Sequence, residues 1–261
     1  MAGDLTNENY FSKENEHDYM SYSQFKDFLE CEAMALAIAE GRYEKPTSNA
    51  LLQGAYVDAY FSGEAEQFKE ANPSIFKKDG SLKAEFEVCE RVIKAIEDDT
   101  YFKEEFFSGK PQVVLTGEIE GVPFKGKIDM LYDDKIVDMK CMASIDPIWD
   151  EEEHRKAPFY AYYKYHIQAA IYRELVRQKT GKTLPYYLAV ATKEREVGKY
   201  SFHFSDDVLD KALELVKALA PRFQAIKNHE IEPNECGKCD YYKSVHKHTI
   251  FDTIEITMDN M

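Results

Sequence analysis

Residues 124–142 place three chemically active side chains close together. The acids Asp129 and Asp138 and the amine Lys140 fall on two segments whose residues alternate as in strands, and residues 133–134 between them are typical of a tight turn. Asp138 and Lys140 are two residues apart and therefore share a face, and the hairpin brings Asp129 alongside. Two carboxylates bind a hard divalent cation, which activates water and stabilises the leaving oxygen of a phosphodiester. We predict a metal-dependent phosphodiesterase site; an ordinary solvated hairpin is the alternative.

The segments around this hairpin indicate which elements must position it. A strand pattern comes first, the hairpin follows, the period then lengthens to that of a helix ended by Gly181, and two more strands complete the order βββαββ. The expected strands are 112–119, 124–131, 135–141, 185–192 and 199–204, and the helix is 158–179. The fold class is therefore α/β (α+β), with a central mixed sheet.

Six residues in this region follow a recognisable motif. The hairpin contains G-K-I-D and then D-x-K, and the helix carries Q-x-x-x-Y. The motif residues are Gly126, Asp129, Asp138, Lys140, Gln168 and Tyr172. The pattern resembles the PD-(D/E)xK nuclease superfamily, in its RecB-like and RecE-like (lambda exonuclease-type) phage branch. The resemblance covers roughly residues 21–245 and implies a restriction-endonuclease-like core flanked by helices, with an N-terminal helical elaboration.

The same resemblance implies an activity. It is that of an exodeoxyribonuclease that uses Mg²⁺ or Mn²⁺ to hydrolyse linear double-stranded DNA from an end, 5′ to 3′ by analogy, in phage or prophage recombination. A structure-specific or CRISPR-adaptation-like nuclease is an alternative, and so is a non-catalytic module that binds DNA ends or a partner. Asp129 and Asp138 would bind the metal, and Lys140 would activate water. Gln168 and Tyr172 share a helical face and would position the phosphate or a metal-bound water; Tyr172 as a plain core residue is the alternative.

Two further acids are candidate metal ligands under the resemblance. Residues 51–61 resemble the G-x-x-x-H helix of this branch, and Asp58 stands where a histidine is usual. Glu118 resembles an acid that lies near the metals in RecE-like proteins. For each, the alternative is an exposed acid, on a helix for Asp58 and in a strand-end turn for Glu118.

The charge balance limits how the protein can bind DNA. The 261-residue chain has 33 Lys and Arg against 48 Asp and Glu, a formal net charge of −15. Because non-specific DNA affinity comes mostly from neutralised phosphates, an acidic nuclease needs its basic residues gathered in a channel. We expect Lys125, Lys127, Lys164 and Arg155 to line such a channel. The acidic excess also predicts weak, distributive cutting unless a homo-oligomeric ring encloses the DNA, as the resemblance implies.

Three of the five cysteines resemble metal-binding cysteines of related nucleases. Cys31, Cys236 and Cys239 resemble cysteines that hold an iron–sulfur cluster in relatives of this branch, but Tyr242 and Val245 stand where a fourth thiolate would be expected. A cluster usually takes four thiolates, so we do not expect one. Zinc completed by His246 or His248 is possible. The simplest interpretation is an element that closes the fold without metal.

We expect one nuclease domain after a short flexible arm. No secretory signal or long apolar run is present, which favours the cytoplasm and no membrane contact. The partners would be DNA ends and, by the resemblance, a single-strand annealing recombinase.

Ser205 is expected to cap a helix over 206–228 that Pro221 kinks or interrupts. The expected parts are an arm at 1–18 and a domain at 19–261, made of a helical wall at 19–110, the catalytic sheet and helix at 111–205, and a final helix and cysteine-containing tail at 206–261.

Overall fold

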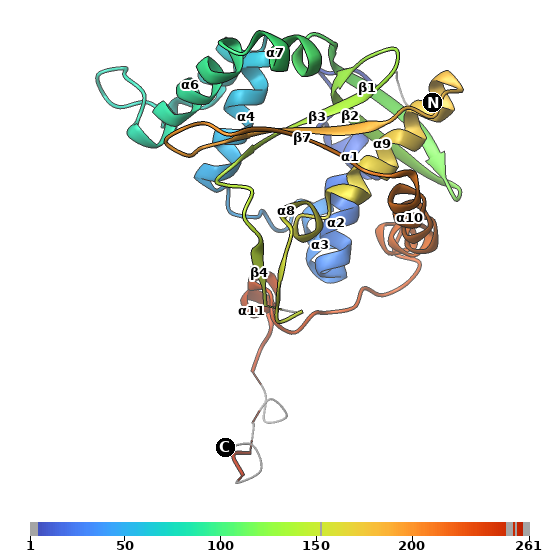
Figure 1. Ribbon diagram of the computed structural model, residues 1–261. Helices are drawn as coiled ribbons and strands as arrows, with labels where there is room; N and C mark the ends of the chain where they lie inside the picture. The colour runs from blue at the N-terminus through green and yellow to red at the C-terminus, as the bar shows by residue number, and fades with distance from the viewer. Residues whose placement is uncertain (1–4, 152, 249–252, 254, 258–261) are drawn as a thin grey trace.

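A five-stranded mixed sheet lies between two layers of helices (Figure 1). The computed structural model describes residues 5–151, 153–248, 253 and 255–257. The strands follow one another in the sheet in the order β1-β2-β3-β6-β7, and only β3 and β6 are parallel. Their bounds are β1 Lys110–Ile119, β2 Val122–Leu131, β3 Ile136–Met142, β6 Tyr186–Thr192 and β7 Lys199–His203. The expected order βββαββ is confirmed, with a small extra hairpin inserted after β3, β4 Ile148–Asp150 and β5 Arg155–Ala157.

Each face of the sheet is covered by its own layer and hydrophobic core (Figure 1). One layer is formed by α4, α6 and α7, the other by α2, α3, α9 and α10. The bounds of the helices are α1 Lys13–Asp18, α2 Tyr22–Glu30, α3 Glu32–Ala39, α4 Asn49–Phe61, α5 Ala65–Ala71, η1 Pro73–Ile75, α6 Ala84–Glu97, α7 Thr100–Phe107, α8 Phe159–Tyr162, α9 Tyr165–Thr180, α10 Asp206–Lys227 and α11 Asp240–Val245. A strand buried on both faces needs apolar residues at successive positions, as β6 has from Leu188 to Ala191.

The helix expected over 158–179 is divided in two. Lys164 has a φ of 59°, in the left-handed region, and separates α8 from α9. Gly181 ends α9 with a φ of 74°, as expected of a glycine at that position. α8 and α9 are therefore separate helices, and α9 carries both Gln168 and Tyr172.

The helix expected over 206–228 runs without interruption from Asp206 to Lys227, so Pro221 does not divide it. Pro221 is exposed, and a proline within a helix removes one main-chain hydrogen bond, to the carbonyl four residues earlier. Ser205 is at the N-cap position as expected, but its hydroxyl hydrogen-bonds Asp207 and makes no cap bond.

The segment expected as a flexible arm makes contacts with the domain over its described residues 5–18. Lys125 is fully buried, and its Nζ donates to the Tyr10 carbonyl at 2.6 Å and pairs with Glu16 at 2.7 Å. Lys227, also buried, donates to the Glu16 carbonyl at 3.1 Å. Two ammonium groups inside the protein therefore need this segment as their partner, an interaction between residues more than 100 positions apart. Residues 1–4 lie outside the described part.

Within the described residues, no helix combines the length and the apolar character that crossing a membrane requires.

Candidate active site

The candidate site forms where β2 and β3 part from each other. Their ladder pairs only Leu131 with Ile136 and Met130 with Val137. Beyond these pairs, the Asp129 carboxylate reaches across and accepts the backbone N–H of Met139 at 2.8 Å. A side chain thus takes the place of a main-chain partner, which holds one Asp129 oxygen still between the two strands.

Asp138 and Lys140 project together from β3, as expected. Asp138 is 1% exposed, and the Lys140 ammonium pairs with its Oδ2 atom. The same ammonium lies 4.8 Å from the ring centroid of Tyr165, a cation–π contact. Because the charge of Lys140 is bound to a carboxylate on one side and a ring on the other, the amine is held in one place.

Asp58 reaches the same site from α4. The amide of Gln112 on β1 donates to both Asp58 oxygens, at 3.2 and 3.3 Å. Gln112 itself is buried and has a φ of 49°, in a gap of the register between the pairs Pro111–Met130 and Val113–Ile128. The solvent-exposed alternative for Asp58 is therefore wrong, and Gln112 orients this acid toward the site.

The acids of the site make each other harder to ionise. Burial, and then the charge of Asp138, raise the pKa of Asp58 to about 6. The same causes, with repulsion from Asp58 added, raise the pKa of Asp129 well above its ordinary value. Burial lowers the pKa of Lys140, but the charges of Asp138 and Asp129 outweigh it, so the net shift is upward. Lys140 thus stays an ammonium ion at neutral pH, and a cation placed among these acids would relieve their repulsion.

Gln168 and Tyr172 lie on the buried face of α9. Gln168 contacts Asp138, and Tyr172 lines the hollow beside Asp129. The Nε2 atom of Gln168 donates to Asp138 Oδ1 at 2.9 Å, while its Oε1 atom is buried without a hydrogen-bond partner. Tyr172 is 7% exposed. A Cβ atom at Gly126 would lie 3.0 Å from both Tyr172 and Leu175, so the glycine of the motif lets α9 approach the sheet.

A hollow of about 510 Å³ opens over the acids. It is lined by Asp58, Asp129, Gln112, Lys127 and Tyr172, with Phe11 among the residues that complete its wall. Lys127 lowers the pKa of Asp58 through its charge, which places its ammonium near the acids. Among the expected DNA contacts, Lys127 is therefore the one that the structure brings to this hollow.

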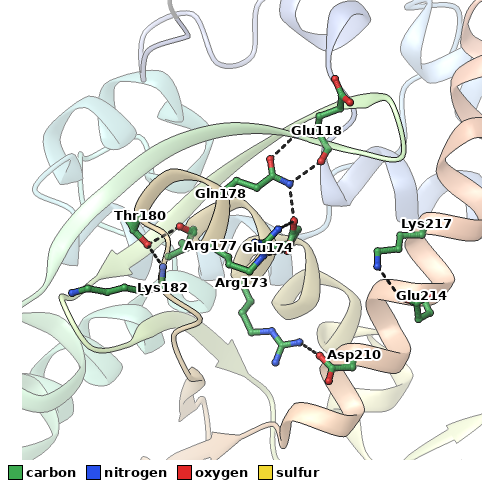
Figure 2. A network of polar contacts seen from close by, with 11 residues as sticks. Glu118, Arg173, Glu174, Arg177, Gln178, Thr180, Lys182, Asp210, Glu214 and Lys217 are labelled. Carbon is green, nitrogen blue, oxygen red and sulfur yellow. Dashed lines mark hydrogen bonds and ion pairs between the residues drawn. The ribbon is translucent and has the colours of Figure 1, made fainter.

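Glu118 does not join the site. It is exposed near the end of β1, and its main chain exchanges two hydrogen bonds with the amide of Gln178, at 3.0 and 2.8 Å (Figure 2). The hollow beside it is lined by Arg173 and Glu174 rather than by the acids of the site. Six residues of an extended strand separate Glu118 from Gln112, roughly 20 Å. The strand-end alternative for Glu118 is correct.

The other expected DNA contacts are divided. Lys125 is buried against the N-terminal segment, so it cannot face DNA, and the expectation for it is wrong. Arg155 is exposed on β5 and pairs with Glu153. Lys164 is half-buried at the start of α9. Neither lines the hollow over the acids.

Three site neighbours escaped the sequence analysis: Gln112, Tyr165 and Tyr186. Tyr186 is fully buried, and burial, with the charge of Asp138 as a lesser cause, raises the pKa of its hydroxyl. The parallel pairing of β6 with β3 puts Tyr186 opposite Ile136. Gln112, Tyr165 and Tyr186 lie near the acids because of how separate strands and helices pack together. No local sequence pattern could therefore have identified them as site residues.

The donor set fits a hard divalent cation. Asp58, Asp129 and Asp138 supply carboxylate oxygens, and Gln168 adds a buried amide oxygen that lacks a partner. Among the described residues, only the sulfur atoms of Cys31, Cys236 and Cys239 form a group of three such ligand atoms within 4.8 Å of one another. The three acids therefore do not converge on one point by themselves, as expected of like charges.

Comparisons with known proteins agree with this fold. Residues 21–245 match the family described as "PDDEXK-like domain of unknown function (DUF3799)". A crystal structure from Eubacterium rectale, described as a "putative exonuclease", is 41% identical and has a TM-score of 0.90; the match covers 95% of this chain and 96% of that one. The comparison with curated proteins gave no match. The fold is restriction-endonuclease-like, and the chain belongs to this PDDEXK-like family, within the PD-(D/E)xK nuclease superfamily.

Proposed function

We propose that this protein is a metal-dependent exodeoxyribonuclease that hydrolyses phosphodiester bonds of linear double-stranded DNA from an end. The observation that carries the proposal is the meeting of Asp58, Asp129 and Asp138 with Lys140, at the point where β2 and β3 separate. A binding-only protein has no need to hold three acids close enough to repel one another, because their repulsion costs stability. The PDDEXK-like family of this chain and the Eubacterium rectale structure described as a "putative exonuclease" support the same class of reaction.

Asp129 and Asp138 would hold Mg²⁺ or Mn²⁺, with Asp58 as a third ligand. The bound cation supplies a water of lowered pKa and charge stabilisation for the scissile phosphate and its leaving oxygen. Asp129 is oriented for this by the Met139 amide, and Asp58 is oriented by Gln112. The three acids therefore reach the reaction from three different elements.

Lys140 would orient the attacking water and offset charge on the phosphate. It does so as an ammonium ion, since the net shift of its pKa is upward. Gln168 fixes Asp138 by a hydrogen bond at 2.9 Å, and its Oε1 atom, buried without a hydrogen-bond partner, would accept from a metal-bound water. Tyr172 lies in the wall of the hollow, one helical turn from Gln168, where its phenol can support the phosphate.

DNA would enter the hollow beside Lys127, with Lys164 and Arg155 as contacts farther along the strand. The net charge of −15 keeps such binding weak and sensitive to salt. A homo-oligomeric ring would offset this by enclosing the DNA. The biological setting that we propose, by resemblance, is phage or prophage recombination in the cytoplasm beside a single-strand annealing protein, with 5′ to 3′ polarity.

Linear duplex DNA labelled at the 5′ or the 3′ end tests the proposal. We expect wild type to release nucleotides with Mg²⁺ or Mn²⁺ and not with chelator, and we expect Asp138→Ala and Lys140→Ala to lose at least a hundredfold in rate. Glu118→Ala, distant from the acids, is the matched control and should keep wild-type rates. Cleavage of flaps or single strands with duplex ends left intact would favour a structure-specific nuclease. Binding of DNA ends without cleavage under any metal would favour a non-catalytic module.

A further inference from the structure

Three cysteine sulfur atoms from opposite ends of the chain meet outside the candidate active site. Cys31 lies at the junction of α2 and α3, and Cys236 and Cys239 lie just before α11. All three sulfur atoms lie within 4.8 Å of one another, and none is in a disulfide. Cysteines about 200 positions apart do not gather in this way unless the tertiary structure holds them together.

The backbone around Cys236 and Cys239 is arranged to favour thiolates. Gly237 has a φ of 72°, which turns the chain so that the N–H of Cys239 points at the Cys236 sulfur, at 3.3 Å. The N–H of Tyr242 points at the Cys239 sulfur, also at 3.3 Å. Sulfur accepts hydrogen bonds weakly as a thiol and far better as a thiolate, which is also the form that binds metal. The turn therefore suits negatively charged sulfur.

Other contacts hold the segment of Cys236 and Cys239 against the junction of α2 and α3, where Cys31 lies. Asn234 exchanges hydrogen bonds with the start of α3, accepting from the Ala33 amide at 3.1 Å and donating to the Glu32 carboxylate at 2.7 Å. Arg222 on α10 donates twice to the same carboxylate, both at 2.7 Å. Nearby, the ring of Tyr241 on α11 packs against Tyr43, with centroids 5.2 Å apart. The cysteines thus sit in a prepared position.

The number of thiolates decides between an iron–sulfur cluster and a single ion. An iron–sulfur cluster is usually held by four thiolates, and this site has three cysteines. Tyr242, at one of the places where a fourth would be expected, stacks on His246 with ring centroids 4.6 Å apart. Val245, at the other, is exposed and carries no ligand atom. The residues present do not fit a four-thiolate cluster.

We propose that Cys31, Cys236 and Cys239 bind one zinc ion, which fastens the C-terminal tail to the junction of α2 and α3. Sulfur atoms of a tetrahedral zinc site with Zn–S bonds of about 2.3 Å lie roughly 3.8 Å apart, so a separation of up to 4.8 Å closes with a shift of about 1 Å. A ligand other than cysteine takes the fourth position, as in Cys3His sites. The ion is structural, and the Asp58, Asp129 and Asp138 site is independent of it.

Metal analysis of the full-length protein tests this directly. Protein from cells supplied with both zinc and iron should contain about one zinc per chain. Cys31→Ser, Cys236→Ser and Cys239→Ser should each lose it, whereas Cys141→Ser, a free cysteine outside the cluster, should keep it. Iron with inorganic sulfide in the purified protein, or wild type without bound zinc, would overturn the proposal.

A measurement on wild type covers the case in which a serine variant fails to fold. With zinc bound, Cys31, Cys236 and Cys239 should resist alkylation and become reactive when a strong chelator is added, as read residue by residue in a mass spectrometer. Cobalt added to the stripped protein should produce the absorption of tetrahedral cobalt–thiolate coordination. Equal alkylation with and without zinc would contradict the proposal. Neither readout involves DNA, so each stands whether or not the protein is an exonuclease.

Discussion

The amide of Gln112 donates to both carboxylate oxygens of Asp58, at 3.2 and 3.3 Å, and joins β1 to α4 over the candidate active site. Gln112 is buried and in a left-handed conformation, a geometry that ordinary strand residues avoid. An acid fixed in this way loses little freedom when it binds a cation, because its orientation is already set.

Gln112→Ala should therefore weaken metal binding without removing a ligand. We expect the Mg²⁺ concentration for half-maximal nuclease activity to rise about tenfold, with a smaller change in the rate at saturating metal. Gln178→Ala, which removes an amide that bonds the main chain of Glu118 instead, is the control. An unchanged Mg²⁺ titration for Gln112→Ala would show that Asp58 needs no such support.

The stability of the metal-free protein should depend on the ionisation of Asp58. The folded-state pKa of Asp58 is about 6, against an ordinary value of 3.8, so the folded state binds the proton more tightly than the unfolded state. The contribution of this group to the free energy of unfolding is therefore undiminished below about pH 4 and falls as the pH rises to about 6.

Asp58→Asn removes this titration. In chelator, the variant should match wild type near pH 4 and exceed it above pH 6 by on the order of 2 kcal/mol, as measured by urea unfolding at each pH. Adding Mg²⁺ should reverse the order, since wild type then gains a ligand–metal bond. A stability difference that stays the same from pH 4 to pH 7 would mean that Asp58 is not strained by its neighbours.

Two glycine substitutions should act in opposite directions. A Cβ atom at Gly126 would lie 3.0 Å from Tyr172 and Leu175, so Gly126→Ala should push α9 from the sheet and destabilise the protein by about 1–3 kcal/mol. Gly54 is inside α4, and a Cβ atom there meets nothing within 4 Å. Gly54→Ala should stabilise by about 0.5–1 kcal/mol through helix propensity. Thermal unfolding of both variants beside wild type measures the contrast.

Two neighbouring lysines on β2 should have different roles. Lys125→Met leaves Glu16 and the Tyr10 carbonyl without their buried partner and should destabilise by about 3 kcal/mol or more. Lys127→Met should leave stability nearly unchanged but reduce the salt dependence of DNA binding by about one phosphate contact. Unfolding curves and binding titrations of catalytically inactive protein at several salt concentrations distinguish the two. The same salt slope for Lys127→Met and wild type would remove Lys127 from the DNA interface.

Much of the fold could be predicted because its signals are local. The strands of the βββαββ order appear near their expected positions, since alternation along a strand needs only adjacent residues. The same reason placed Asp138 beside Lys140, two residues away on one face. The end of α9 at Gly181 was also predictable, because a left-handed cap depends on one residue.

What failed depended on contacts that alternation cannot show. Lys125 falls on a strand with Lys127 and was expected to bind DNA, yet the N-terminal segment covers it. Glu118 follows an acid pattern of the resembled branch, but the register of β1 and β2 leaves it far from Asp129. In both cases, an element distant in sequence decided what the side chain meets.

The sequence by itself indicated the class of this protein through the resemblance of its motif to the PD-(D/E)xK superfamily. It also determined the central hairpin with Asp129, Asp138 and Lys140, because strand alternation and a short turn bring these residues together locally. Only the tertiary structure decided that Asp58 joins them with Gln112 and that three distant cysteines share one place. Those relationships depend on how α4, β1 and the C-terminal tail pack. Packing of that kind is set by the summed burial of whole faces and not by any run of neighbouring residues.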